Sequence, residues 1–307
     1  MIRLEELTRT FDGTVAIRDL TLSVSEGQVF GFIGPNGAGK TTTVRILCCL
    51  IGASSGRAFI GENECGKEPD SMYIRQMIGL LPEAPGLYDR LSAYRNLDFY
   101  GRLYGVKDGQ RKERIKDLLT TLKIWHRKDE CVSTFSKGMR QKIAIARALV
   151  HEPRILFLDE PTAGLDPEAA KTVREFILDL KREGGTIFLN THNLYEAERL
   201  CDRIGVLKTR LVAVGSPDEL SRRFWGRTTV VRVKSLTPQI LDAVRSLDFV
   251  TNLQEEDGEL FIGLDNPDER NPTIARTIME NGGEIQYISE FKRRLEEVYL
   301  KLIGGSA

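Results

Sequence analysis

The feature that most constrains how this sequence folds is the run Gly34-Pro-Asn-Gly-Ala-Gly-Lys-Thr41, which matches the pattern GxxxxGK followed by Ser or Thr. Glycines let such a loop curl so that successive N–H groups point inward, where they can hold a triphosphate. Lys40 can reach the outer phosphates as a point charge, and the Thr41 hydroxyl suits Mg²⁺, which prefers oxygen ligands. Apolar residues 29–33 predict a strand before the loop and residues 40–50 predict a helix after it, so the context also indicates a nucleotide site.

Two adjacent acids end a second apolar strand, in the run Arg154-Ile-Leu-Phe-Leu-Asp159-Glu160. A buried strand that carries a carboxylate to its C-terminal end is typical of a Mg²⁺ partner at the edge of a doubly wound sheet. Asp159 is therefore the candidate Mg²⁺ ligand, and Glu160 is the candidate group that orients or deprotonates the attacking water. Taken alone, the pair has the alternative interpretation of a strand end capped by two solvated acids.

Strands alternate with helices over the first two thirds of the chain, which indicates an α/β sheet. Residues 89–128 look mainly helical, because they lack β-branched runs. Helices are predicted at 137–150, 167–182 and from 194 onward, and strands at 155–158 and 186–190.

The pattern changes between residues 215 and 226. Beyond this point the predicted order is strand, helix, strand, strand, helix, strand and a final amphipathic helix, with a hairpin signal at Asp257-Gly258. That order matches a ferredoxin-like α+β fold. We therefore expect a cassette at residues 1–220 and a small accessory domain at residues 227–307.

The charge of the chain is balanced, with 44 Lys and Arg against 44 Asp and Glu. This balance gives no electrostatic reason to expect nucleic acid or an anionic membrane surface as the main partner. No apolar run reaches the length of about 18 residues that a membrane helix needs. The N-terminus carries charges where a signal peptide needs apolar residues. We therefore expect a cytoplasmic protein that another chain anchors if it works at a membrane.

The cysteines show no CxxC spacing, which predicts reduced and mostly buried thiols rather than a zinc or redox site. They are Cys48, Cys49, Cys65, Cys131 and Cys201.

Several further runs resemble the motifs of ABC ATPases. Phe135-Ser-Lys-Gly-Met-Arg-Gln-Lys142 resembles the signature motif LSGGQxQR, and Pro161-Thr-Ala-Gly-Leu-Asp166 resembles the D-loop. Leu189-Asn-Thr-His192 resembles the switch histidine, although His192 alone would be read as a structural histidine. Leu80-Leu-Pro-Glu83 occupies the Q-loop position, and Phe11 lies where the family places an aromatic ring that stacks on adenine.

These runs follow the order of an ABC transporter ATP-binding subunit over about residues 2–220. The resemblance implies a P-loop NTPase fold, with a RecA-like core, an antiparallel β subdomain and a helical subdomain at about 84–150. It also implies two cassettes that sandwich two ATP molecules with Mg²⁺, so that Ser136 and Gly138 touch the γ-phosphate held by the partner. Glu160, His192 and Lys40 are then the catalytic residues, and Thr41, Glu83 and Asp159 are the metal residues. The residues expected at ATP are Phe11, Asn36, Gly37, Ala38, Gly39, Lys40, Thr41, Thr42, Ser136, Gly138 and Asp166.

The chain shows three departures from the family pattern. Glu83 replaces the usual glutamine, which keeps an oxygen ligand for Mg²⁺ but adds a charge. The signature reads FSKGM, in which Ser136 and the second glycine are kept. Phe11 replaces the more usual tyrosine, and stacking needs only the ring face.

The Q-loop region, the signature and the C-terminal domain together resemble the ABC-2 type export branch, which includes drug-resistance and sodium-efflux cassettes. The resemblance implies ATP-driven export through a separate membrane-spanning permease, with the cassette peripheral on the inner face of the membrane. The alternative is a soluble ABC switch without a membrane partner, but such proteins usually carry two cassettes or a coiled coil. For the C-terminal domain, dimer support, regulation and ligand binding all stay open.

Overall fold

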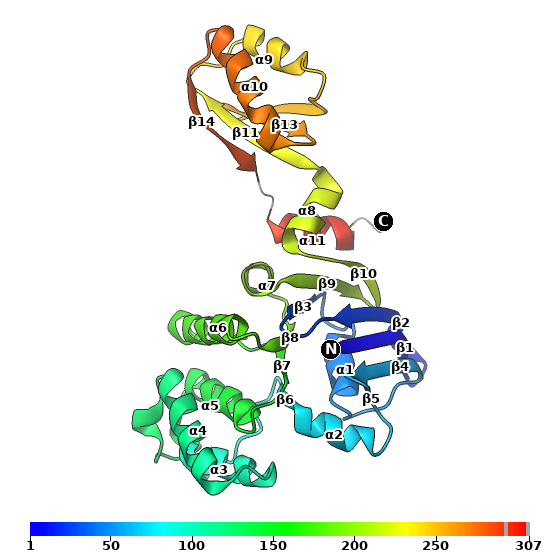
Figure 1. The fold of residues 1–307 in the computed structure, drawn as a ribbon, viewed down its shortest axis with the longest axis vertical. Coiled ribbons are helices and arrows are strands. Elements are labelled where there is room, and N and C mark those ends of the chain that lie inside the picture. The colour runs from blue at the N-terminus through cyan, green and yellow to red at the C-terminus, as the bar shows by residue number, and fades with distance from the viewer. Residues whose placement is uncertain (292–293, 305–307) are drawn as a thin grey trace. The chain divides into compact units, whose positions relative to one another are not determined.

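The computed structural model describes residues 1–291 and 294–304 (Figure 1). Contacts between residues divide the chain into two compact units, Met1–Val214 and Gly215–Ala307. The sequence placed residues up to 220 with the first domain, whereas the contacts place helix α8 (Pro217–Trp225) with the second unit. Among the described residues, no helix is both long and apolar enough to span a bilayer.

The centre of the first unit is a six-stranded sheet in the order β10-β9-β3-β8-β7-β6. The four pairs from β9 through β3, β8 and β7 to β6 are parallel. Strands β3, β7 and β8 are buried along their whole length, because a parallel sheet is covered on both faces. The strands are β3 (Val29–Ile33), β6 (Ile78–Leu81), β7 (Ile155–Asp159), β8 (Thr186–Asn190), β9 (Arg203–Lys208) and β10 (Arg210–Gly215).

A second, four-stranded sheet in the same unit has the order β2-β1-β4-β5, with antiparallel pairs throughout. Its strands are β1 (Ile2–Phe11), β2 (Thr14–Val24), β4 (Ser55–Ile60) and β5 (Asn63–Glu64). Its apolar side chains, such as Leu4, Leu20 and Ile60, share one hydrophobic core with Phe30, Phe157 and other residues of the six-stranded sheet. The two sheets therefore pack together through a shared core, and the loop that follows β3 lies within the same unit.

Helices of the first unit fall into those that flank the sheet and those of a helical subdomain (Figure 1). The subdomain contains α3 (Ala93–Leu103), α4 (Asp108–Thr121) and α5 (Lys137–Leu149), with the 3₁₀ turns η1 (Trp125–Arg127) and η2 (Val132–Thr134) between α4 and α5. The remaining helices are α1 (Lys40–Leu47), α2 (Asp70–Met77), α6 (Pro167–Arg182) and α7 (Leu194–Leu200). Together these elements form the α/β cassette with β and helical subdomains that the sequence predicts.

The second unit contains an antiparallel sheet in the order β12-β13-β11-β14. The turn between β12 and β13 has positive φ angles at Asp257 (51°) and Gly258 (77°), the conformation for which the Asp-Gly pair is suited. A separate core, which includes Val231, Ile262 and Ile278, lies between the sheet and its helices. The elements are α8, β11 (Arg227–Val233), α9 (Pro238–Arg245), β12 (Asn252–Glu256), β13 (Glu259–Leu264), α10 (Pro267–Glu280), β14 (Ile285–Phe291) and α11 (Leu295–Gly304).

All five cysteines are free, but the expectation that most are buried is wrong. Cys48 and Cys201 are buried, Cys49 and Cys65 are partly exposed, and Cys131 is exposed. The reason is that Cys131 lies in the loop before η2, where the chain runs over the surface. Within the described residues, no group of His, Cys, Asp and Glu side chains is arranged to hold a metal ion by itself.

Candidate nucleotide site

A cleft of about 460 Å³ opens over the loop between β3 and α1. It brings together residues from both sheets and from the loops after β6, β7 and β8, which lie far apart in the sequence. Its lining residues are Phe11, Ala16, Asn36, Gly37, Ala38, Gly39, Lys40, Thr41, Thr42, Glu83, Asp159, Glu160, Ala163 and His192. Most of the residues that the sequence singled out are therefore gathered in one place.

The loop is shaped by glycines that have no room for a side chain. Gly39 has a φ of 101°, and a Cβ atom there would lie 2.4 Å from the carbonyl oxygen of Ala16. A Cβ atom on Gly34 would lie 2.2 Å from the carbonyl oxygen of Leu207. The backbone can thus curl tightly against β2 and β9, which leaves the N–H groups at the start of α1 available to an anion.

Lys40 lies at the bottom of this loop and is 8% exposed. Its ammonium donates hydrogen bonds to the carbonyl oxygens of Gly34, at 2.7 Å, and Pro35, at 3.1 Å. Burial lowers its pKa below the usual value, while the carboxylates of Glu160 and Asp159 act in the opposite direction. A buried cation with two carboxylates nearby is well placed to attract the outer phosphates of a nucleotide.

Asp159 ends strand β7 with a side chain that is 4% exposed. Its Oδ1 atom accepts a hydrogen bond from Nδ2 of Asn190, at 3.3 Å, on the neighbouring strand β8. The Oδ1 atom of Asn190 is itself buried without a hydrogen-bond partner. The carboxylates of Asp159 and Glu83 and the Thr41 hydroxyl line the same cleft, and together they form a donor set that fits Mg²⁺ and its water ligands.

Glu160 follows with a left-handed backbone, at a φ of 51°. Its N–H donates to the carbonyl oxygen of Asn190, at 3.0 Å, which ties the turn to β8. Its Oε1 atom lies 2.8 Å from Nδ1 of His192, and its Oε2 atom lies 3.5 Å from the hydroxyl of Thr191. The carboxylate predicted to act on water is therefore held against the predicted switch histidine.

Ser136, Gly138 and Asp166 are not among the residues that line this cleft. Ser136 caps α5 by accepting a hydrogen bond from the N–H of Met139, at 3.3 Å. Asp166 caps α6 by accepting one from the N–H of Ala169, at 2.9 Å. A Cβ atom on Gly138 would lie 2.7 Å from Cβ of Ala169, so the two helix starts pack closely. The structure thus places two groups of predicted residues apart within one chain.

Phe11 and Glu83 both lie at the cleft, as expected from the sequence. The Phe11 side chain is 41% exposed, and the guanidinium of Arg9 lies over its ring at 4.4 Å. A partly exposed aromatic ring at the cleft suits the stacking of a planar base.

Glu196 is a residue near the site that sequence reasoning missed. It is 1% exposed on α7, and its carboxylate accepts hydrogen bonds from the Thr162 hydroxyl, at 2.5 Å, and from Arg174, at 2.9 Å. It therefore joins the segment after Glu160 to the helix that follows His192. The only signal in the sequence was an acid on the apolar face of α7, which is too common to single out.

The fold and the cleft define the chain as a P-loop ATPase with an ATP-binding cassette. The model of the family described as ABC transporter matches residues 17–163. The linearmycin resistance ATP-binding protein LnrL of Bacillus subtilis is 31% identical over 99% of this chain and 98% of its own length. The Nod factor export ATP-binding protein I of Cupriavidus metallidurans is 34% identical over 99% of this chain and 97% of its own.

A solved structure of the ATP-binding cassette MJ0796, a dimer in a post-hydrolysis state bound to ADP and Pi, matches with a TM-score of 0.64 and 25% identity, covering 70% of this chain and 98% of that one. The chain therefore belongs to the ABC transporter ATP-binding proteins. It is an ATP-binding and ATP-hydrolysing subunit that uses Mg²⁺, and its relatives dimerise as cassettes.

Proposed function

We propose that this cassette pairs with a second cassette around two ATP molecules and powers export through a separate membrane-spanning subunit. The observation that carries the proposal is the separation of the site into two groups. Lys40, Asp159 and Glu160 lie in one cleft, whereas Ser136 and Gly138 lie outside it at the start of α5. Since a helix start attracts phosphate, a second chain must bring its α5 to complete each site.

Each group in the cleft has a role in this proposal. The loop at residues 34–41 and Lys40 would bind the phosphates. Thr41, Asp159 and Glu83 would hold Mg²⁺, which would supply positive charge beside the phosphates. Glu160 orients the attacking water and accepts its proton, and His192, 2.8 Å from Glu160, donates toward the γ-phosphate. Asp166 links the two sites across the interface. Exclusion of water by the second chain strengthens each of these contacts.

Export is proposed because of the names of the relatives. One relative that spans nearly the whole chain is named for resistance and another for export. A subunit of this kind would lie in the cytoplasm, attached to the inner face of the membrane through its partner.

The test is a pull-down of tagged Glu160→Gln protein from detergent-solubilised membranes in the presence of Mg-ATP, read by mass spectrometry. The substitution keeps the shape of the side chain but removes the base, so we expect an ATP-bound dimer that hydrolyses ATP at least about a hundredfold more slowly. We expect it to recover a polytopic membrane protein in stoichiometric amount. Lys40→Ala, which should lose most ATP binding, is the matched control that should not accumulate as a dimer.

Recovery of soluble partners alone would contradict the export proposal and favour a soluble switch. Normal turnover by Glu160→Gln would contradict the assigned role of Glu160.

A further inference from the structure

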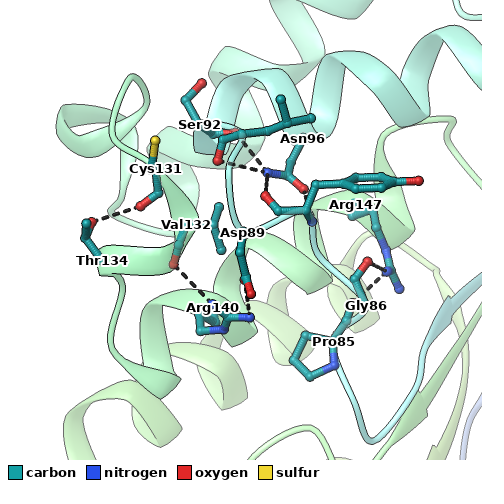
Figure 2. Close-up of polar contacts among 12 residues, drawn as sticks. Pro85, Gly86, Asp89, Ser92, Asn96, Cys131, Val132, Thr134, Arg140 and Arg147 are labelled. Carbon is teal, nitrogen blue, oxygen red and sulfur yellow. Dashed lines mark hydrogen bonds and ion pairs between the residues drawn. The ribbon is translucent and has the colours of Figure 1, made fainter.

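The loop between β6 and α3 contains Glu83, and helix α5 holds this loop through two arginines. Arg147 donates to the carbonyl oxygens of Pro85, at 2.6 Å, and Gly86, at 3.0 Å, and also to that of Leu80, at 3.2 Å. Arg140, seven residues earlier, forms an ion pair with Asp89 at 2.6 Å. Seven residues are about two helical turns, so both arginines lie on the same face of α5. Figure 2 shows both side chains reaching the loop.

The guanidinium of Arg140 bonds to a second segment as well. It donates to the carbonyl oxygen of Val132, at 3.2 Å, in the 3₁₀ turn η2 that ends just before Ser136 (Figure 2). The N–H of Arg140 also donates to the carbonyl oxygen of Ser136, at 2.9 Å, in the first turn of α5. The guanidinium therefore connects the loop after Glu83 with the turn before the signature, and the backbone of the same residue belongs to the first turn of the signature helix.

Backbone hydrogen bonds connect the same loop to the turn η2. The N–H of Ser133 donates to the carbonyl oxygen of Asp89, at 3.0 Å, and the N–H of Val132 donates to that of Leu91, at 3.0 Å. Asn96 is fully buried and exchanges hydrogen bonds with the backbone of Tyr88, at 2.8 and 3.1 Å. The loop is thus a defined structure up to the point where it meets α5, and a displacement near residue 89 would move the start of α5.

We propose that Asp89 and Arg140 are positioning residues that set the start of α5, and with it Ser136, for the nucleotide bound by a second cassette. The proposal rests on the role of Ser136 described under Proposed function. Neither side chain lines the chain's own cleft. Their effect should therefore appear in steps that need two cassettes, and binding of ATP by one chain should not change.

The exposure of Asp89 and Arg140 indicates that their ion pair contributes little to the stability of the fold, which distinguishes a positioning role from a stabilising one. The Asp89 side chain is 58% exposed and that of Arg140 is 29% exposed. Ion pairs this exposed contribute little to the free energy of unfolding, because water screens the charges. Variants at either position should therefore fold normally, so a loss of turnover cannot be ascribed to unfolding.

The experiment compares Arg140→Gln, Asp89→Arg and the swapped pair Asp89→Arg with Arg140→Asp. Each is measured for ATP binding by the single chain, for kcat and KM of ATP hydrolysis, and for ATP-driven dimerisation in the Glu160→Gln background. We expect binding by one chain within about twofold of the unsubstituted protein and kcat lower by about tenfold to a hundredfold, since small misplacements at a site have effects of this size. The swapped pair should exceed Asp89→Arg in kcat, because it restores the attraction between positions 89 and 140, although it does not restore the hydrogen bond to Val132.

The matched control is Arg182→Gln, which removes an equally short exposed pair, with Asp179 at 2.6 Å, at the far end of α6. It should leave kcat unchanged. Normal kcat in Arg140→Gln, or a swapped pair no faster than Asp89→Arg, would overturn the inference. Failure of Glu160→Gln itself to dimerise with ATP would instead contradict the proposed function, so the two failures can be told apart.

Discussion

Gly39 closes the phosphate-binding loop with a φ of 101°, and Ala16 on β2 occupies the space where a side chain would begin. A charged side chain can be replaced by a similar one, but glycine is the only residue that has no Cβ atom. The shape of the site therefore depends on this position as strictly as its electrostatics depend on Lys40.

Gly39→Ala should weaken ATP binding by at least about tenfold, because a left-handed backbone costs a non-glycine residue about 1–2 kcal/mol and the Cβ atom would meet a carbonyl oxygen. Titration with a fluorescent ATP analogue measures the change, and circular dichroism shows that the variant is folded. The control is Gly184→Ala, which has a φ of 81° but no atom within 4 Å of the new Cβ. Equal affinities in the two variants would contradict the packing argument.

At the scale of elements, the sequence predicted those with a strong local signal. The strands at 29–33 and 186–190 and the helix at 167–182 have the predicted bounds. Both strands are fully buried around an apolar centre, and Asp166 caps the helix. Helix α10 begins at Pro267 and contains a second proline, Pro272, in its interior. Proline is favoured at a helix start, so the local signal alone does not decide which of the two prolines begins the helix.

Helix α2 was missed, since it is short and has only Ser71 and Ile74 buried. The motifs predicted most of the lining of the cleft, because phosphate binding depends on local runs. Glu196 could not be predicted, since its role depends on Arg174 and Thr162, which only the fold brings to it.

Glu196→Gln should lower the free energy of unfolding by about 1–3 kcal/mol, because the buried carboxylate loses its charge-assisted hydrogen bond with Arg174. It should also lower kcat severalfold, since Thr162 follows Glu160 so closely. Urea unfolding and an ATPase assay measure the two effects. Glu175→Gln, which alters an exposed pair on α6, should be neutral in both. Unchanged stability in Glu196→Gln would contradict the inference that Glu196 holds the segment after Glu160 to helix α7.

At the scale of the whole molecule, the two units have separate cores. All residues that line the cleft belong to the first unit. The sequence indicated two domains from the change in pattern near residue 215. The sequence could not assign α8 to one of the two units. The local sequence of a helix between two domains does not indicate the domain against which the helix packs.

Ile262→Ala should destabilise only the second unit, by about 2–5 kcal/mol, because the side chain is fully buried in that core. Differential scanning calorimetry with and without Mg-ATP measures this, since ATP should raise the midpoint of the first unit alone. Ile46→Ala, in the other core, should shift the ATP-sensitive transition instead. A single transition that both substitutions lower equally would show that the units do not unfold separately.

The left-handed backbone at Glu160 has a consequence for how such a protein can evolve. At a φ of 51°, glycine would hold the same turn with less strain, and the strain on glutamate is of order 1–3 kcal/mol. A laboratory selection for thermal stability alone would therefore favour replacing the residue that we propose acts on water. Stabilised variants of this cassette need to be screened for turnover as well as for melting temperature, since the most heat-resistant of them could be inert.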